Sequence, residues 1–438
     1  AGIATYMGTK GFSAQSYRRI IGANDRVNVG VVGFSDRFRG ALLPSFLKLR
    51  KELNFDMVAV SDIWKLRREQ GQAYLKDKLG HDIAPCVNNE ALYSLKNIDA
   101  VFISTADFQH ALHTVEAVKA GKDTYTEKPL AETMADARAV LKAVKDSGKI
   151  VQIGSQRRSG AAYQSAYDFI NQGKFGPIVS VELIWNVNQP GRWRRPDVVP
   201  LLREADTDWK RYLLNRPYEA FDPRKYLEFR LFWPYSSGIP GQWMCHQIDT
   251  VHWFANLAHP RSVAVNGGIY AWKDGRKNAD TMTAVFDYGP PSDLTNGFQV
   301  IFSSRMTNSS GGVKEIYYSN GGTLNLDTNQ ISPEGGLNEK YAGAMGMKAN
   351  LLPSMSLNDL AAKVTTDANT GSDDLTVSHV RNWMECVRSR KQPNAPVEAG
   401  YNHSIAVIMS NAAYRTGQKV TFDEKTQEIM AGGKAFTY

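Results

Sequence analysis

Over residues 27–153, short apolar runs rich in β-branched residues alternate with longer amphipathic segments. This alternation is typical of β-α-β units, in which parallel strands are joined by crossover helices. Because such crossovers are right-handed, successive units place their helices against one parallel sheet. We predict strands at 27–32, 55–61, 99–104, 123–126 and 150–153, with helices at 40–52, 64–78, 109–120 and 132–147.

The pattern changes after Gly154, where alternating runs are separated by Gly, Pro, Asn and Asp. Such runs indicate a mostly antiparallel sheet. Residues 188–245 are rich in Trp, Arg, Tyr and Pro with little periodicity, so we expect an ordered excursion near an interdomain cleft. We predict helices at 162–173, 376–390 and 399–416, and strands at 177–187, 261–272, 281–288, 298–306 and 313–326.

The chain has 438 residues, more than the roughly 250–300 that usually share one hydrophobic core. The predicted fold class is therefore α/β with two domains. Residues 25–154 form a doubly wound parallel sheet, and residues 155–438 form an α+β domain with a large, mostly antiparallel open sheet and the C-terminal helices. Residues 1–24 are an N-terminal arm or a trimmed leader.

Residues 1–14 are small and uncharged apart from Lys10, and they end in Phe-Ser-Ala, which suits a signal-peptidase site. Export, for example to the periplasm, is one prediction; a disordered arm on a cytoplasmic protein is the alternative. No apolar stretch approaches the ~20 residues that span a bilayer, so we predict no membrane span.

The net charge of +8 is spread along the chain, and residues 192–196 (RWRRP) form its sharpest basic cluster. A lone cluster of this kind indicates a substrate or subunit surface, and we predict no nucleic-acid partner. The three cysteines, Cys86, Cys245 and Cys386, are too few and too scattered for a disulfide framework or a Cys-rich zinc site.

The first predicted strand runs into residues 33–38, GFSDRF. In the G-x-G-x-x-G turn of dinucleotide sites, the backbone approaches the pyrophosphate at a helix N-terminus. Only Gly33 is kept here, and Ser35 and Phe38 occupy the second and third glycine positions. Because serine is small and can hydrogen-bond a phosphate, the departure leaves dinucleotide binding intact as a prediction.

Asp62 follows the second predicted strand, where a carboxylate can accept hydrogen bonds from the adenosine ribose hydroxyls. Because an acid there repels a 2′-phosphate, we favour NAD, and NADP stays possible because Lys65 and Arg67 lie close by. The alternative role for Asp62 is to cap the following helix.

Residues 125–130, YTEKPL, put Lys128 at the carboxyl end of a predicted parallel strand, where open α/β sheets bind ligands. Pro129 holds the residue before it extended. An ammonium beside a nicotinamide can donate to a carbinol oxygen. Taken alone, Lys128 could equally be a surface lysine in a turn.

Several further motifs accompany the Gly33 turn: residues 105–110 (TADFQH), 127–129 (EKP), 154–159 (GSQRRS) and 241–249 (GQWMCHQID). On these motifs the chain resembles the glucose-fructose oxidoreductase, inositol dehydrogenase and MocA group (Gfo/Idh/MocA) over most of residues 25–425. The resemblance implies an N-terminal Rossmann domain, pyranose or cyclitol substrates, and a homodimer or homotetramer formed through the open sheet.

By position, Lys128 is similar to the family's catalytic lysine and His246 to its acid/base histidine. Many family dehydrogenases carry an aspartate four residues before that histidine. This chain has Gln242 instead, which cannot take up a proton or carry charge near neutral pH. The proton chemistry is then expected of His246 and Lys128.

Asp249 lies three residues after His246 on a segment with helical periodicity, so we predict that its carboxylate orients the imidazole. His252 extends the spacing to i, i+3 and i+6, which aligns poorly on a helix. We therefore favour a core-edge histidine over a metal ligand and predict no metal site.

The remaining candidates fall into two groups. For a sugar, we expect charged forks and aromatic faces, although packing is the alternative for each side chain. His110 either approaches the nicotinamide or contacts backbone. The predicted cofactor residues are Gly33, Ser35, Arg37, Phe38, Asp62, Thr105, His110, Glu127 and Lys128; the predicted substrate residues are Arg157, Trp193, Arg230, Tyr235, Gln242 and Asp249, with Trp233 also considered.

The sequence thus predicts an NAD(P)-dependent oxidoreductase that moves a hydride between a nicotinamide and a carbinol carbon of a sugar, glycoside or cyclitol. One alternative is a glycoside-cleaving enzyme that oxidises its substrate transiently with a tightly bound NAD. The other is a non-catalytic dinucleotide-binding protein, suggested by Ser35, Phe38 and Gln242.

Overall fold

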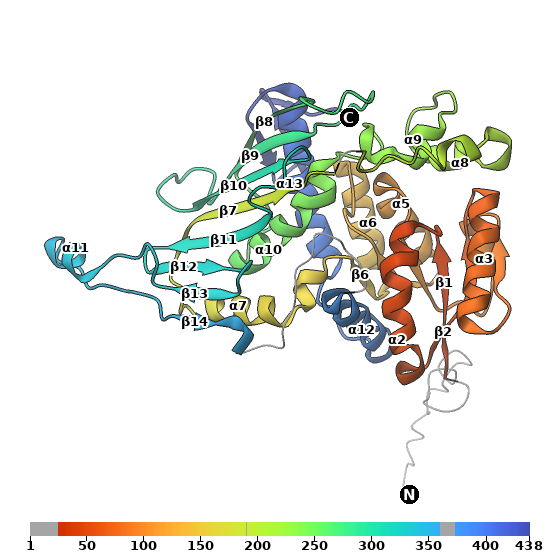
Figure 1. Ribbon diagram of the computed structural model, residues 1–438, viewed down its shortest axis with the longest axis horizontal. Coiled ribbons are helices and arrows are strands. Elements are labelled where there is room, and N and C mark those ends of the chain that lie inside the picture. Colours follow the sequence, from red (N-terminus) through yellow and green to blue (C-terminus); the bar gives the residue numbers. More distant parts are fainter. Residues whose placement is uncertain (1–24, 190, 360–372) are drawn as a thin grey trace, which may run out of the picture.

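The protein is described from a computed structural model covering residues 25–189, 191–359 and 373–438 (Figure 1). The predicted arm or leader at 1–24 lies outside these residues. The chain forms two sheets, one of six strands and one of eleven, which lie at opposite ends of the molecule with helices between them. None of the helices in the described ranges combines the length and the apolar character that a bilayer span requires.

The first sheet is parallel throughout and has the strand order β3-β2-β1-β4-β5-β6, as the predicted doubly wound sheet requires. Its apolar strands are buried because helices cover both faces: α2 and α3 on one, α4 and α5 on the other. The strands are β1 Val27–Val32, β2 Phe55–Ser61, β3 Ala84–Cys86, β4 Ala100–Ile103, β5 Asp123–Thr126 and β6 Val151–Ile153; the helices are α2 Leu43–Leu53, α3 Lys65–Leu79, α4 Asn89–Tyr93, α5 His110–Lys119 and α6 Met134–Ser147.

Two elements of this domain were not predicted. Strand β3 and helix α4 are three and five residues long, too short for a periodic signal. Helix α4 nevertheless begins at a recognisable cap, since the side chain of Asn88 accepts a hydrogen bond from the Ala91 backbone N–H at 2.9 Å.

The second sheet has the order β14-β13-β12-β11-β7-β10-β9-β8-β15-β16-β17. All its pairs are antiparallel except β7 with β10, so the prediction of a mostly antiparallel sheet is confirmed. The strands are β7 Ile178–Asn186, β8 Ser262–Gly268, β9 Thr281–Tyr288, β10 Phe298–Arg305, β11 Val313–Ser319, β12 Gly322–Asn325, β13 Gln330–Ser332, β14 Met355–Ser356, β15 Val420–Asp423, β16 Glu428–Ala431 and β17 Lys434–Ala435; the helices are α7 Ala161–Asn171, α8 Trp209–Leu213, α9 Pro223–Leu227, α10 Cys245–Ala255, α11 Glu339–Ala344, α12 Asp374–Ser389 and α13 Val397–Thr416.

The single strand predicted at 313–326 is wrong. It is a hairpin of β11 and β12 that reverses at Asn320-Gly321. Asn-Gly is the strongest short hairpin signal, and it was overlooked inside a long apolar run. The short strands β13 to β17 were also missed, because two to four residues show no clear alternation.

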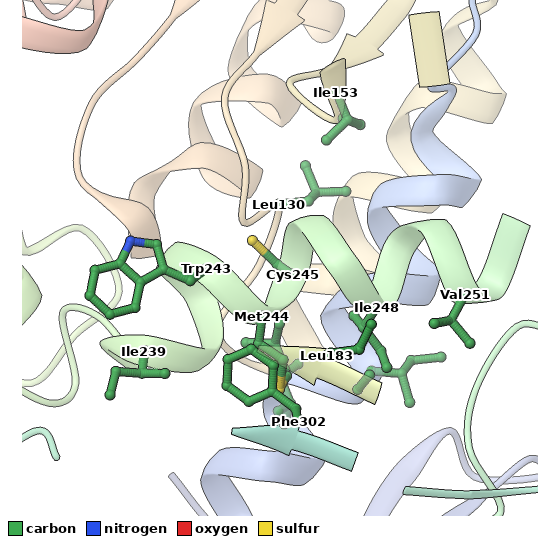
Figure 2. Packing of buried hydrophobic residues seen from close by; sticks show 14 of the residues in the cluster. Leu130, Ile153, Leu183, Ile239, Trp243, Met244, Cys245, Ile248, Val251 and Phe302 are labelled. Carbon is green, nitrogen blue, oxygen red and sulfur yellow. The ribbon is translucent and has the colours of Figure 1, made fainter. Parts of the chain in front are cut away.

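Helix α10 lies between the two halves of the molecule and packs on both (Figure 2). Leu130 and Ile153, from the loops and strands of the first domain, lie against one side of it. Leu183 of β7 and Phe302 of β10 lie against the other side. The orientation of α10 is therefore set by contacts with both domains.

Helix α12 packs differently from its predicted place in the second domain. Its apolar face, including Val380 and Trp383, joins the core of the first sheet beside α2. The Trp383 ring is fully buried, with its centroid 4.7 Å from that of Phe102 and 6.2 Å from that of Phe55. The 3.6-residue period identified the apolar face of this helix but not its partner.

We expect Trp383→Ala to lower the free energy of unfolding by about 3–5 kcal/mol, since it empties a large buried volume between α12 and the first sheet. Trp383→Phe is the matched control. It keeps a ring in the site. The indole N–H that it removes has no hydrogen-bond partner among the described residues, so the loss of unfolding free energy should be smaller. Urea denaturation measures both. Equal losses, or a loss below about 1 kcal/mol in the alanine variant, would contradict this packing.

Candidate active site

A cavity of about 750 Å³ opens at the carboxyl edge of the first sheet. Its volume lies in the range of small-molecule and cofactor sites, roughly 300–1,000 Å³. One wall comes from the loops after β1, β2, β4 and β5, and the other from residues 185–246 of the second domain. The predicted excursion near the cleft is therefore correct, and it forms much of that second wall.

The turn after β1 has the conformation that a phosphate site needs. Gly33 has φ +83°, and a Cβ there would lie 2.7 Å from the Thr105 side chain, so only glycine fits. The Ser35 hydroxyl accepts a hydrogen bond from the Phe38 backbone N–H at 3.1 Å, at the start of the helical segment leading into α2. Serine thus replaces the second glycine without opening the turn.

Phe38, in contrast, does not line the cavity. Its ring is fully buried between Phe34 and Phe102, with centroids 6.1 and 5.9 Å away. The expectation that its side chain contacts the cofactor is not met, because the third position of the turn faces the core beneath the first helix. Ser35, Arg37 and Gly33 do line the cavity.

Asp62 lines the cavity and also holds the backbone around it. Its two oxygens accept hydrogen bonds from the N–H groups of Phe34 at 3.0 Å and Trp64 at 2.9 Å. Burial raises the pKa of Asp62 above its ordinary value, and these two bonds, with Arg67 nearby, oppose that rise. The ribose-binding and structural roles considered for this carboxylate are therefore compatible.

The side chains present fit a bound dinucleotide. The Gly33 turn leaves room for a phosphate, Asp62 faces the cavity, and the buried Thr105 hydroxyl on the cavity wall has no hydrogen-bond partner among the described residues. Arg37 lies beside this turn and pairs with Glu127, Nε to Oε1 at 2.8 Å. Although burial opposes it, the charges of Arg37 and Lys128 hold the pKa of Glu127 below its usual range.

Lys128 follows β5 and reaches the second domain. Its Nζ donates hydrogen bonds to the carbonyl oxygens of Gln242 at 2.9 Å and Gly241 at 3.4 Å. Both carbonyls belong to the π-helical turn Pro240–Met244, which runs directly into α10 and His246. Lys128 and His246 line the same cavity, as the sequence predicted for a catalytic pair.

His246 is buried, and its ring stacks on Trp185 with centroids 5.8 Å apart. Burial lowers the pKa of His246 well below its ordinary value, and the positive charges of Lys128 and Arg157 lower it further. The imidazole is therefore neutral near pH 7 and able to accept a proton.

Asp249 does not orient His246, so that prediction is wrong. Its carboxylate is bound by the Arg158 guanidinium at 2.7 and 3.0 Å, and Nδ1 of His403 lies 3.7 Å away. Although burial alone would raise it, these partners hold the pKa of Asp249 below its usual range. Both residues lie on α10, but Asp249 turns away from the cavity and towards Arg158.

Gln242 connects two charged side chains. Its Nε2 donates to Asp107 Oδ2 at 2.5 Å, and its Oε1 accepts from Arg230 Nε at 2.7 Å. The same Asp107 oxygen also accepts from the Ser236 hydroxyl at 2.6 Å. Asp107 thus supplies a carboxylate beside the position where many family members have an aspartate. Asp107 belongs to the 105–110 motif, but its hydrogen bond with Gln242 was not predicted.

His110 lines the cavity and contacts backbone on both sides of its ring. Nδ1 lies 2.8 Å from the Pro129 carbonyl oxygen and Nε2 lies 3.2 Å from that of Thr105. Burial lowers the pKa of His110, so the ring carries one proton and donates to one of these carbonyls. His110 therefore contacts backbone, as one of its two predicted roles requires, and it also lines the cavity.

The candidate sugar residues divide into two sets. Trp193, Arg230 and Gln242 line the cavity, whereas Arg157, Tyr235 and Asp249 do not. Arg157 is paired with Glu315 in the core, and the Tyr235 hydroxyl is bonded to Glu219. Trp233 is likewise outside the cavity. The cavity residues of the aromatic-rich excursion and sheet that were missed include Trp185, Arg192 and Trp243.

His252 shares a buried hydrogen bond with the Tyr288 hydroxyl at 2.8 Å, which fits a core histidine. No group of three or more His, Cys, Asp or Glu side chains suited to a metal ion occurs within the described ranges. The three cysteines are buried free thiols.

The sheet order, the glycine turn and the acid after β2 define a two-domain protein that binds a dinucleotide at the edge of a Rossmann sheet. A sequence model described as "Oxidoreductase family, NAD-binding Rossmann fold" (GFO_IDH_MocA) matches residues 27–155. This match confirms the predicted resemblance to the Gfo/Idh/MocA family over the first domain.

Two curated relatives each match more than a third of the chain. A 1,5-anhydro-D-fructose reductase from Ensifer adhaerens is 31% identical over 163 residues, which cover 35% of this chain and 48% of the relative. An inositol 2-dehydrogenase from Salmonella paratyphi B is 31% identical over 167 residues, or 38% and 48% of the two chains. The chain therefore spans about half the length of these relatives.

Solved structures match over both domains. A levoglucosan dehydrogenase in complex with NADH and levoglucosan superposes with a TM-score of 0.65 at 14% identity, covering 90% of this chain and 99% of that one. The WlbA dehydrogenase from Bordetella pertussis, in complex with NADH and UDP-GlcNAcA, gives 0.63 at 16% identity, covering 91% and 99%. These likenesses confirm the fold of the whole described chain.

We expect Gln242→Glu to lower the free energy of unfolding by about 1–3 kcal/mol, because it puts a second carboxylate within hydrogen-bond distance of Asp107. The double variant Asp107→Asn with Gln242→Glu restores one amide and one carboxylate, so it should recover most of the loss. Urea denaturation at pH 7 measures both proteins. A double variant as unstable as the single one would show that the charge of Asp107 is not the cause.

Proposed function

We propose that this protein is an NAD(P)-dependent oxidoreductase that acts on a carbinol carbon of a sugar, glycoside or cyclitol. The observation that carries the proposal is that Lys128 and His246 face the same cavity as the Gly33 turn and Asp62. Proton chemistry and dinucleotide binding therefore share one enclosed space. The curated relatives named above are a reductase and a dehydrogenase of such compounds.

Each residue has a role that follows from its contacts. A bound nicotinamide supplies the acceptor for the hydride. His246 is neutral and takes the hydroxyl proton as the carbonyl forms. Lys128, held by the carbonyls of Gly241 and Gln242, donates a hydrogen bond to the same substrate oxygen and so polarises it. In the reverse direction, His246 returns the proton.

The preference for NAD over NADP rests on the Asp62 carboxylate facing the cavity. Arg67 lines the cavity nearby, 3.5 Å from Asp36, and it would accommodate a 2′-phosphate if it left that partner. We accordingly propose NAD as the working cofactor and NADP as a weaker substitute.

We expect Lys128→Met and His246→Gln each to lower kcat by about 10²- to 10⁴-fold, the usual contribution of a positioned acid or base. Lys174→Met, at an exposed lysine on the surface, is the matched control. NADH absorbance with external NAD and a panel of hexoses, cyclitols and glycosides measures the rate, and calorimetry checks that NAD still binds. Unchanged turnover in either site variant would refute the assigned roles.

One observation favours the glycoside-cleaving alternative. Residues 195–212 are tied across the cavity to the first domain at both ends: Arg195 to Asp36 at 3.4 Å, and Arg211 to Glu116 at 2.7 Å. Next to Arg211, the Tyr212 carbonyl oxygen accepts a hydrogen bond from Gln109 Nε2 at 2.7 Å. A cofactor bound beneath this segment would dissociate slowly. An enzyme that oxidises and then re-reduces its own substrate requires such slow dissociation.

Cofactor retention separates the two reactions. For the glycosidase we expect the purified protein, once denatured, to release about one dinucleotide per chain, and to free sugar from glycosides with no net NADH. A dehydrogenase would instead form NADH with added NAD. Tight dinucleotide binding with neither product across the panel would support the non-catalytic alternative.

We also propose a homodimer or homotetramer formed through the outer face of the second sheet. The inner face is covered by α10 and α13, whereas on the outer face Ile301 is 38% exposed and lies opposite Val285. Light scattering of the purified protein tests the assembly.

Export rests only on the character of residues 1–14, and cell fractionation of the full-length protein tests it.

A further inference from the structure

Three cations gather at the end of the cavity where the proposed proton chemistry takes place: Lys128, Arg192 and Arg230. None of them forms an ion pair with a carboxylate in the part of the chain that the structure describes. Their direct partners are carbonyl and amide oxygens instead. Such partners satisfy hydrogen bonds but leave the positive charge unbalanced.

Arg192 is placed at this end by a series of stacked rings. Its guanidinium lies over Trp243, 5.4 Å from the ring centroid. Trp243 is parallel to Trp185 at 6.1 Å, and Trp185 stacks on His246 at 5.8 Å. Arg192 is therefore connected to the proposed acid/base histidine through the stacked rings of Trp243 and Trp185.

The hydrogen bonds of Arg192 are incomplete. One terminal nitrogen donates to the Gln189 side chain, and the buried Nε has no partner among the described residues. Burial, together with the nearby charges of Arg230 and Arg195, lowers the pKa of Arg192 to about 10. Two guanidinium groups held this close, without an acid between them, are a cost to the folded protein.

Arg230 is fixed by Gln242, which accepts from its Nε at 2.7 Å, and it lies over Phe229 at 4.5 Å. Behind Gln242, Asp107 provides the only carboxylate that this hydrogen-bond chain contains within the described residues. The charges of Asp36 and Glu127 also act on Arg230, but these two carboxylates are already paired with other arginines, and His246 is neutral. This end of the cavity thus has a surplus of positive charge.

The rest of the cavity is different. Arg37 is paired with Glu127 at 2.8 Å, and Arg211 with Glu116 at 2.7 Å. Arg67 and Arg195 both approach Asp36, at 3.5 and 3.4 Å. Each of these arginines therefore has a carboxylate partner, although Asp36 is shared, whereas Arg192 and Arg230 have none among the described residues.

We propose that the substrate is an acidic sugar whose carboxylate is held by Arg192 and Arg230. The proposal rests on the proposed function and narrows its substrate class to uronic acids and their glycosides. A carboxylate accepts hydrogen bonds from two guanidinium groups and removes their mutual repulsion. The hydroxyl that reacts then lies between Lys128 on the first-domain wall and His246 on the second-domain wall. Two other ligands carry similar charge, a sugar phosphate and the cofactor's own pyrophosphate, and the test separates them.

Calorimetry on the NADH-saturated protein compares galacturonate with galactose, glucuronate with glucose, and glucose 6-phosphate with both. We expect at least one uronate to bind tenfold more tightly than its neutral partner. Arg192→Gln and Arg230→Gln should each reduce that ratio of affinities roughly ten- to hundredfold, the range for a charge-assisted hydrogen bond. Arg203→Gln is the matched control, because this exposed arginine of the same segment pairs only with Asp206.

No preference for either uronate, or a preference for the phosphate, would overturn the proposal. Weaker NADH binding in both site variants, with an unchanged ratio, would assign the arginines to the cofactor and overturn it as well. Because binding is measured without turnover, uronate binding that yields no NADH would count against the proposed oxidoreductase only. Oxidation of neutral sugars alone would count against the uronate only.

Discussion

The hydrogen bonds from Lys128 to the carbonyls of Gly241 and Gln242 join the two domains at the point where the chemistry is expected. An ammonium in such a partly buried place needs oxygen partners, and these two come from the turn that starts α10. The same turn presents the Gln242 side chain to Asp107. It also fixes the position of the first residues of α10, including His246. The geometry of the site thus depends on one cross-domain contact.

The contacts around this junction are polar but nearly all satisfied. Ser236 and Ser237, just before the turn, donate to Asp107 and Glu132 of the first domain. Burial and the neighbouring charge of Asp107 raise the pKa of Glu132 to about 8, so Glu132 is protonated near neutral pH. This junction therefore carries one negative charge fewer than the sequence alone would count.

The sequence predicted what periodicity encodes. Strands β1, β2 and β5 and helices α3 and α13 lie within two residues of their predicted bounds, because long runs with a clear period identify both type and extent. Periodicity does not name a partner. The apolar face of α12 was recognised, but its place against Phe55 and Phe102 follows from tertiary packing.

The same limit applies to the site. Gly33, Asp62 and Lys128 were found because turn chemistry and strand ends place them at the carboxyl edge of the first sheet, and His246 was found through the family resemblance. Asp249 was wrongly paired with His246, since spacing along a helix cannot reveal that Arg158 reaches it from a distant turn. Arg192 was noted only as part of a basic cluster, and its position beside Trp243 depends on a long irregular segment.

The late position of α12 has a consequence for synthesis on the ribosome. All six strands of the first sheet have been made by Ile153, but the helix that covers Phe55 and Phe102 begins about 220 residues later. At roughly 5–20 residues per second, that interval lasts about ten to forty seconds. During this time the nascent first domain exposes an apolar groove that α12 will later fill. The growing chain is therefore prone to aggregate during this interval. A chaperone that binds exposed aromatic surfaces would then raise the yield of folded protein.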